Sequence, residues 1–137
     1  MIILDTNVLG ELARPLADPN VVRWVDQQVP SELATTAITA AEMALGAARL
    51  DDGQRKTQLV VLNAAILERL SAVLPFSARD AANYARVMHE RQRLGRRIEP
   101  LDAQIAAIAL SHGAIVATRN TKDFEDCGVD LVDPWAA

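Results

Sequence analysis

Short apolar runs recur along the chain, separated by longer segments in which apolar and polar residues are mixed. Short continuous runs bounded by turn residues are typical of strands that are buried on both faces of a parallel sheet. We therefore predict five strands, at residues 2–4, 33–36, 72–76, 114–118 and 129–132.

The segments between these runs carry apolar residues three and four positions apart, which is the spacing of a helix with one buried face. Pro and Gly residues mark the ends of several of them. We predict helices at residues 7–12, 20–28, 39–50, 54–71, 78–94 and 99–112. Alternating strands and helices build βαβ units, so the pattern predicts an α/β fold with a parallel sheet covered on both faces. A length of 137 residues suits one domain, residues 1–137.

The start of the third helix carries a capping-box pattern, in which a Thr precedes a Glu by three residues. Thr39 and Glu42 fit this pattern, so we expect the helix to begin at Thr39 with Glu42 in its first turn. A Glu42 side chain turned back to cap Thr39 is less free to bind a ligand.

Three carboxylates occupy notable positions in this pattern. Asp5 follows the first strand and Glu42 begins the helix after the second, and ligands of open α/β sheets bind outside the carboxyl ends of the strands. Asp102 lies in a first helical turn before the fourth strand, so strand order alone does not bring it to the same edge. Purely structural roles are the alternative: a helix N-cap for Asp5, the capping box for Glu42 and a favourable helix-dipole position for Asp102.

Three carboxylates in one cleft repel one another, and at least one stays protonated unless a cation is present. Clusters of oxygen ligands suit Mg²⁺ or Mn²⁺. Such an ion lowers the pKa of its bound water and stabilises charge on a phosphate, as phosphodiester hydrolysis requires. Asp5, Glu42 and Asp102 are therefore our candidate catalytic residues and metal ligands. His89 and His112 have no partner at zinc-ligand spacing, which argues against a zinc site.

Polar residues after the first and fourth strands are candidates for supporting this cluster. Thr118 and Asn120 can hydrogen-bond carboxylates or metal-bound water, and Asp123 offers a further acid. The alternative for this segment is a turn followed by a capped short helix. The full set of supporting candidates is Thr6, Asn7, Thr118, Asn120 and Asp123.

The net charge of −4 and the pI of about 5.1 argue against non-specific nucleic-acid binding. A basic stripe nevertheless runs along the helix that precedes Asp102, and a local basic patch beside an acidic site can hold a phosphate backbone. The alternative is an ordinary solvated helix face. The candidates for contacts with an RNA backbone are Arg86, Arg93, Arg96 and Arg97.

Cys127 is the single cysteine, so no intrachain disulfide can form, and a reducing compartment is expected. The opening residues lack the basic region of a secretory signal, and no apolar run reaches the ~18–20 residues that span a bilayer. We therefore expect a cytoplasmic protein without a membrane segment.

Four ordered motifs carry a family resemblance: Ile-Leu-Asp-Thr-Asn at residues 3–7, Ala-Ile-Thr-Ala-Ala-Glu at 37–42, Leu-Asp-Ala-Gln-Ile-Ala-Ala at 101–107 and Ala-Thr-Arg-Asn at 117–120. This set resembles PIN-domain proteins. The length of the chain and Trp135 near its end are similar to the VapC/FitB-type toxins of bacterial toxin–antitoxin pairs.

The resemblance implies a three-layer α/β/α sandwich in which acids matching Asp5, Glu42 and Asp102 surround Mg²⁺ or Mn²⁺. It implies a toxin that is an endoribonuclease, with a metal-activated water as the nucleophile. It also implies a homodimer and a cognate antitoxin, whose C-terminal segment inhibits the active site while its N-terminal part binds operator DNA. The expected partners are therefore RNA, the antitoxin, a second copy of the chain and, through the antitoxin, DNA.

One position departs from this family, because many members carry a fourth acid where Asn120 stands. Asn120 brings no charge, so a second metal site would require Asp123 in place of that acid. A catalytically weak PIN-fold module that binds RNA or a partner is therefore the main alternative. A phosphatase with an aspartate nucleophile is another, but that class needs a second Asp where this chain has Asn7.

Overall fold

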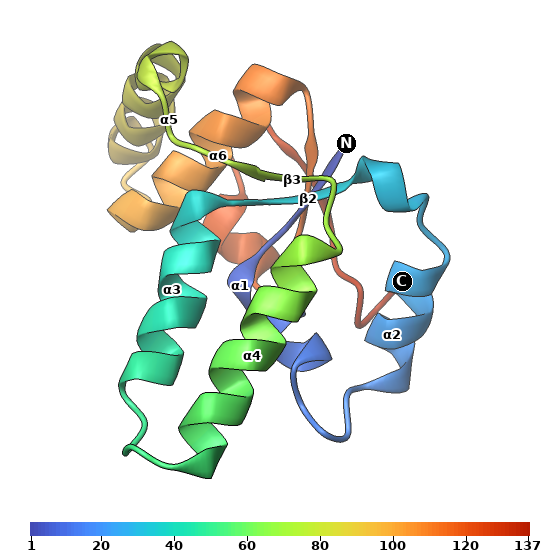
Figure 1. Cartoon of the computed structure of the whole chain (residues 1–137). Coiled ribbons are helices and arrows are strands. Elements are labelled where there is room, and N and C mark those ends of the chain that lie inside the picture. Colours follow the sequence, from blue (N-terminus) through green and yellow to red (C-terminus); the bar gives the residue numbers. More distant parts are fainter.

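Each of the five predicted strands is present in the computed structural model, which describes residues 1–137 (Figure 1). The strands are β1 (Ile2–Leu4), β2 (Leu33–Thr36), β3 (Ala72–Leu74), β4 (Ile115–Ala117) and β5 (Asp130–Val132). The helices are α1 (Thr6–Leu12), α2 (Pro19–Asp26), α3 (Ala37–Ala48), α4 (Gln54–Glu68), α5 (Ala81–Arg93) and α6 (Pro100–His112). Short 3₁₀ helices are η1 (Pro30–Glu32), η2 (Ala78–Asp80) and η3 (Thr121–Phe124).

The strands form one parallel sheet in the order β3-β2-β1-β4-β5. The chain first builds outward from β1 to β3 and then crosses back to place β4 on the other side of β1. The switch point of the sheet therefore lies between β1 and β4, which is where ligands of such sheets bind.

Side chains of the central strands alternate between the two faces of the sheet, as the two-residue period of a strand requires. Ile3 and Val116 belong to a core cluster that includes residues of α5 and α6. Leu4 and Ala117 belong to a second cluster, with residues of α1, α2 and α3. Figure 1 shows the two groups of helices on opposite sides of the strands. The predicted α/β/α sandwich with a five-stranded parallel sheet is thus confirmed.

Helix α3 begins earlier than predicted. Its N-cap is Thr36, whose side-chain oxygen accepts a hydrogen bond from the Thr39 backbone N–H at 3.2 Å. The predicted capping box at Thr39 is therefore wrong: Thr39 lies inside the helix, and Glu42 is in its second turn. Thr36 had been assigned only to the strand, although a Thr at a strand end can cap the helix that follows. This start leaves Glu42 free of any capping role.

Helix α6 brings its first turn to the carboxyl edge of the sheet because of the way it joins β4. Gly113 ends α6 in the left-handed conformation, with φ 59° and ψ 34°, and the chain turns back directly into β4. Helix and strand therefore run in opposite directions, and the start of α6 lies beside the end of β4. None of the helices combines the length and apolar character needed to cross a bilayer.

Candidate active site

Asp5 is the buried centre of the site, with 7% of its surface exposed. It is the N-cap of α1 and accepts a hydrogen bond from the Thr6 backbone N–H at 2.8 Å. Its other carboxylate oxygen accepts from the Thr118 hydroxyl at 2.9 Å and from the Asn7 amide at 3.3 Å. The capping role and the site role of Asp5 therefore coexist in one side chain.

The register of β1 and β4 brings Asp5 and Thr118 together. Leu4 pairs with Ala117, and the Asp5 backbone N–H donates to the Ala117 carbonyl at 2.9 Å. The next residue of each strand, Asp5 and Thr118, therefore leaves the sheet edge at the same height. The short buried strands of the predicted sheet thus meet at the switch point with a carboxylate on one and a hydroxyl on the other.

Asn7 is held by bonds to both ends of its side-chain amide. Its Nδ2 also donates to the Thr118 hydroxyl oxygen at 3.1 Å, and its Oδ1 accepts from the Arg119 backbone N–H at 3.1 Å. The Asn120 backbone N–H donates to the same Thr118 oxygen at 3.1 Å. Asn7 therefore fixes the loop after β4. Because its side chain is an amide, it cannot supply the general acid that the phosphatase alternative requires.

Glu42 lies on α3 and Asp102 on α6, and the charge of Asp5 raises the pKa of both, so the three acids are close to one another. Burial, and then the negative charge of Asp5, raises the pKa of Glu42. Burial also raises the pKa of Asp102 to about 6, with further increases from the charges of Asp5, Asp123 and Glu42. Burial raises the pKa of Asp5, and the hydrogen bond from the Thr6 N–H lowers it by a smaller amount.

The charge of a neighbouring carboxylate raises each of these three pKa values, so the acids of the site repel one another. As placed, no three Asp, Glu, His or Cys side chains form a ready-made ligand cage. The donor set of oxygens suits Mg²⁺, which usually keeps several waters and takes only one or two carboxylates directly. The chemistry of the residues therefore fits a hydrated divalent cation, with Asp5, Glu42 and Asp102 as the side chains that would hold it.

The supporting candidates divide into those within the buried network and those at its rim. Thr118 is fully buried and Thr6 donates to the Thr39 hydroxyl at 3.4 Å. Asn120 and Asp123 are exposed in the segment after β4, where η3 forms the predicted short helix. The charge of Asp123 raises the pKa of both Asp5 and Asp102, so it is the further acid near this cluster.

The predicted RNA-contacting arginines mostly lie beside acids. Arg93 pairs with Glu90 at 2.6 Å, and Arg96 pairs with Glu125 at 3.0 Å. The other contacts in this set are Arg96 with Asp126 at 2.5 Å, Arg97 with Glu99 at 3.7 Å and Arg86 with the Asn83 amide oxygen at 2.8 Å. Exposed pairs of this kind contribute little energy and can be exchanged for a phosphate, so the RNA contacts stay a prediction.

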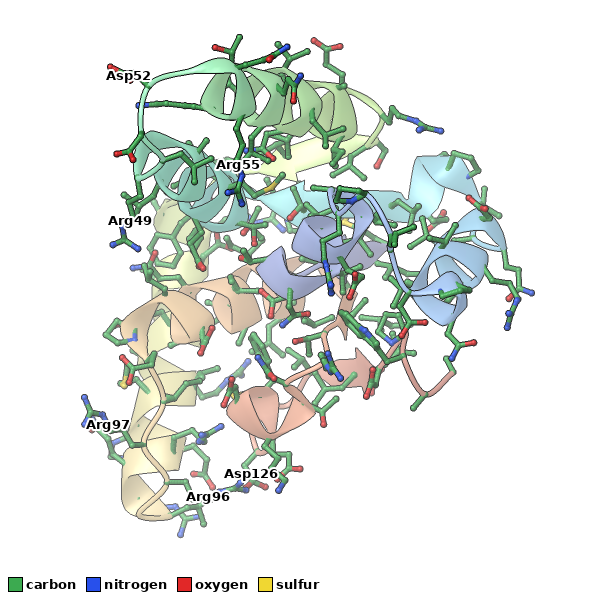
Figure 2. All side chains as sticks on the ribbon, turned by 90° about the horizontal axis from the view of Figure 1, so that it is seen from below. Arg49, Asp52, Arg55, Arg96, Arg97 and Asp126 are labelled. Atoms are coloured by element: carbon green, nitrogen blue, oxygen red, sulfur yellow. The ribbon has the colours of Figure 1, made fainter.

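Other arginines near the site were missed in the sequence because they lie in a different segment. Arg14 and Arg55 line a cavity of about 570 Å³ together with Thr6 and Glu42. Figure 2 shows Arg49 and Arg55 at the α3–α4 turn, and Arg96 and Arg97 on the other side of α6. Arg49 and Arg55 form no ion pair. Arg14 and Arg55 are therefore the basic residues that share a cavity with Glu42.

Arg91 has a structural role that its position among the basic residues of α5 did not indicate. Its side chain is buried, at 3% exposure, and donates to the carbonyls of Asp123 at 3.1 Å and Glu125 at 2.7 Å. It also donates to the carbonyls of Arg96 at 3.0 Å and Arg97 at 2.8 Å. A guanidinium has five donors in a rigid fork, so one side chain can hold these two loops together.

Residues 2–129 match the family model described as PIN domain. The chain is 40% identical over 137 residues to the VapC ribonuclease Y4jK of Sinorhizobium fredii, with 98% of each protein covered. It is 39% identical over 137 residues to the Toxin FitB of Neisseria gonorrhoeae, covering 98% of this chain and 99% of that toxin. Each likeness extends over nearly the whole chain.

Solved structures give the same result. The crystal structure of FitAcB from Neisseria gonorrhoeae has a TM-score of 0.93 at 38% identity, with 100% of both chains covered. A structure of FitAB bound to an IR36 DNA fragment has a TM-score of 0.92 at 39% identity, covering 98% of this chain and 96% of the other. A toxin–antitoxin complex from Klebsiella pneumoniae has a TM-score of 0.75 at 25% identity, covering 98% of both.

We expect Asp102→Asn to stabilise the protein at neutral pH in the presence of EDTA. The unfolded chain releases the Asp102 proton near the ordinary pKa of 3.8, whereas the folded chain releases it at about 6. The wild type therefore loses stability between about pH 4 and pH 6, and the full penalty persists above that range. The expected gain is about 1 kcal/mol at pH 7.5, reduced for solvent screening of a partly exposed group.

Thermal unfolding of both proteins from pH 4 to pH 8 measures this effect. The difference in melting temperature should be largest at pH 7 to 8 and shrink toward zero as the pH approaches 4. A constant difference across this range would show that Asp102 carries no such repulsion.

Arg91→Met should lower the free energy of unfolding by about 3 kcal/mol, because buried carbonyls lose their donors. Urea unfolding followed by circular dichroism measures the loss. Arg93→Met is the matched control on the same helix, with an exposed pair whose removal should change stability by less than about 0.5 kcal/mol. Equal losses in the two variants would contradict the conclusion that Arg91 holds the two loops together.

Proposed function

Because this chain belongs to the PIN-domain family, we propose that it is the toxin of a toxin–antitoxin pair and a metal-dependent endoribonuclease. The proposed reaction is hydrolysis of RNA phosphodiester bonds, assisted by Mg²⁺ or Mn²⁺. The observation that carries the proposal is the convergence of Asp5, at the end of β1, with Glu42 of α3 and Asp102 of α6, all three with raised pKa values. The relative named VapC ribonuclease supports the substrate class.

The protein's own residues would prepare the site before RNA arrives. Asp5 is held in one orientation by the Thr6 N–H, the Thr118 hydroxyl and the Asn7 amide, so it loses little freedom when a ligand binds. A bound divalent ion would supply an acidic water as nucleophile and a positive charge opposite the phosphate. Glu42 and Asp102 are close enough for the charge of Asp5 to raise their pKa values, and they would remain ionised once a positive ion is present.

An antitoxin would bind to a surface of the toxin, and α4 offers an apolar surface. No residue of α4 is buried, although the helix is rich in Val, Leu and Ile. Together with α1 and α2 it borders a groove of about 430 Å³ that is mostly apolar. Its apolar lining includes Leu9, Leu12, Val22, Val25, Leu62, Ile66 and Leu70. We propose that the cognate antitoxin covers this groove and links the toxin to operator DNA; the structure of FitAB bound to a DNA fragment supports a DNA partner.

A second apolar patch supports the proposal that the chain forms a homodimer. Leu45, Phe76 and Leu101 are 47%, 38% and 48% exposed and line a hollow of about 460 Å³ beside Ile38. Exposed apolar side chains that are grouped in this way mark protein–protein contacts more often than single ones do. The patch lies next to Glu42, so a second copy would border the acidic site.

A PIN-fold module that binds RNA without cleaving it remains the second candidate, because Asn120 lacks the charge of a fourth acid. Exposed Asp123 is close enough to influence Asp5 and Asp102 and favours the catalytic form. Titration with Mn²⁺ distinguishes the two. If the acids bind the ion, Mn²⁺ should raise the melting temperature of the wild type but not of Asp5→Asn.

The central test incubates the partner-free protein with total RNA and Mg²⁺ or Mn²⁺. Discrete fragments are expected with the wild type and should be absent with EDTA. Asp5→Asn, Glu42→Gln and Asp102→Asn should each lower the cleavage rate by about 100-fold or more, because each removes charge from the site. Fragments that persist with Asp5→Asn and with EDTA would contradict a metal-dependent reaction at this site.

The groove proposal predicts that Val22→Glu weakens antitoxin binding at least about ten-fold, since a charge would be buried without a partner. Isothermal titration of the purified toxin with its antitoxin measures the affinity. Leu94→Glu is the control, because this residue is exposed at the end of α5 on the other side of the sheet. Equal binding by Val22→Glu and the wild type would place the antitoxin elsewhere.

A further inference from the structure

Arg119 lies over the ring of Trp135, with its guanidinium carbon 5.1 Å from the ring centroid. Arg119 is exposed and forms no ion pair, so its charge and its outer face are available. Arginine can stack on an aromatic ring through its planar guanidinium, and a guanidinium that contacts one ring can accept a second ring on its other face.

Both members of this stacked pair are held in place. The Arg119 backbone N–H donates to the Asn7 side chain at 3.1 Å, one residue after the Thr118 hydroxyl that binds Asp5. Trp135 packs against the core cluster on the α1–α2 side, and its backbone N–H donates to the Asp133 carboxylate at 2.9 Å. The plate formed by the two side chains is therefore attached to the same network that orients Asp5.

The plate borders a hollow of about 500 Å³ that also contains Glu11, Arg14 and Asp18. Glu11 is buried and pairs with Arg14 at 3.2 Å, while Asp18 accepts from the Asn20 backbone N–H at 2.9 Å. Two arginines and two carboxylates balance in charge, which does not favour a phosphate. A flat plate with hydrogen-bond donors and acceptors around it suits a nucleobase.

The position of the hollow relative to the acids also favours a neighbouring nucleotide. Helix α1 leads from its cap at Asp5 to Glu11, and six residues of helix span about 9 Å. The hollow is therefore too far away for the phosphate that is cleaved, but within reach of an adjoining nucleotide of the same strand.

We propose that Arg119 and Trp135 form a stacking platform for one unpaired nucleobase of the RNA strand, next to the bond that is cleaved. The inference rests on the ribonuclease function proposed above and adds a specificity-determining subsite to it. The base stacks on the outer face of the Arg119 guanidinium, while the carboxylates and arginines of the hollow meet its polar edge. Trp135 is the positioning residue that keeps Arg119 flat.

The first arm of the test measures binding without cleavage. Fluorescence anisotropy with a labelled single-stranded RNA of mixed sequence is recorded for Asp5→Asn protein in EDTA. Adding Arg119→Ala should weaken binding about ten-fold, and Arg119→Lys should not restore it, because lysine keeps the charge but not the plane. Arg69→Ala, an exposed arginine after α4 without an ion pair, should leave binding unchanged.

The second arm sequences the ends of fragments made from a randomised RNA by otherwise wild-type protein. Arg119→Ala and Trp135→Phe should flatten the base preference at one position beside the cut. Arg69→Ala should reproduce the wild-type pattern. Thermal melts of all variants confirm that they are folded at the assay temperature.

The two arms separate this inference from the function on which it rests. If the wild type does not cleave RNA but Arg119→Ala weakens binding in the first arm, the nuclease function is rejected and the platform is kept. Normal cleavage with unchanged binding and unchanged base preference in Arg119→Ala would reject the platform and keep the nuclease. Restoration of binding by Arg119→Lys would also reject it, since a simple charge contact would then suffice.

Discussion

The pairing of β1 with β4 is the constraint on which the candidate site depends. Because Leu4 lies opposite Ala117, Asp5 and Thr118 leave the sheet together, and their hydrogen bond is 2.9 Å long. Asn7 then joins both to the loop that carries Arg119. A shift of one residue in this register would turn Asp5 away from Thr118 and exchange the two core faces.

The acids of the site destabilise the folded chain through their burial and their electrostatic repulsion. Burial and mutual repulsion raise the pKa values of Asp5, Glu42 and Asp102, so the folded chain is less stable at neutral pH than one without them. Such perturbed groups gather at functional sites more often than elsewhere. A bound divalent cation would relieve the repulsion, which would link metal binding and stability to the proposed chemistry.

Arginines perform three different tasks around this centre, and only their surroundings distinguish them. Arg91 is buried and ties two loops together through backbone carbonyls. Arg96 is exposed and pairs with Glu125 and Asp126 on the outside of the same loops. Arg119 is unpaired and stacked on Trp135. Arg91 and Arg96 belong to one basic stretch of the sequence, whereas Arg119 lies in the polar segment after the fourth strand.

The sequence alone determined the alternation of strands and helices, because that depends on local periodicity and on Pro and Gly at the ends. It also identified Asp5, which directly follows a strand. Two features needed the tertiary structure. Helix α3 begins after Thr36 because this last residue of β2 caps the helix. Asp102 reaches the site because α6 runs antiparallel to β4. Arg91 also bonds the carbonyls of Asp123 and Glu125, and Arg119 lies over Trp135; these partners are more than 15 positions away along the chain, beyond the reach of any local pattern.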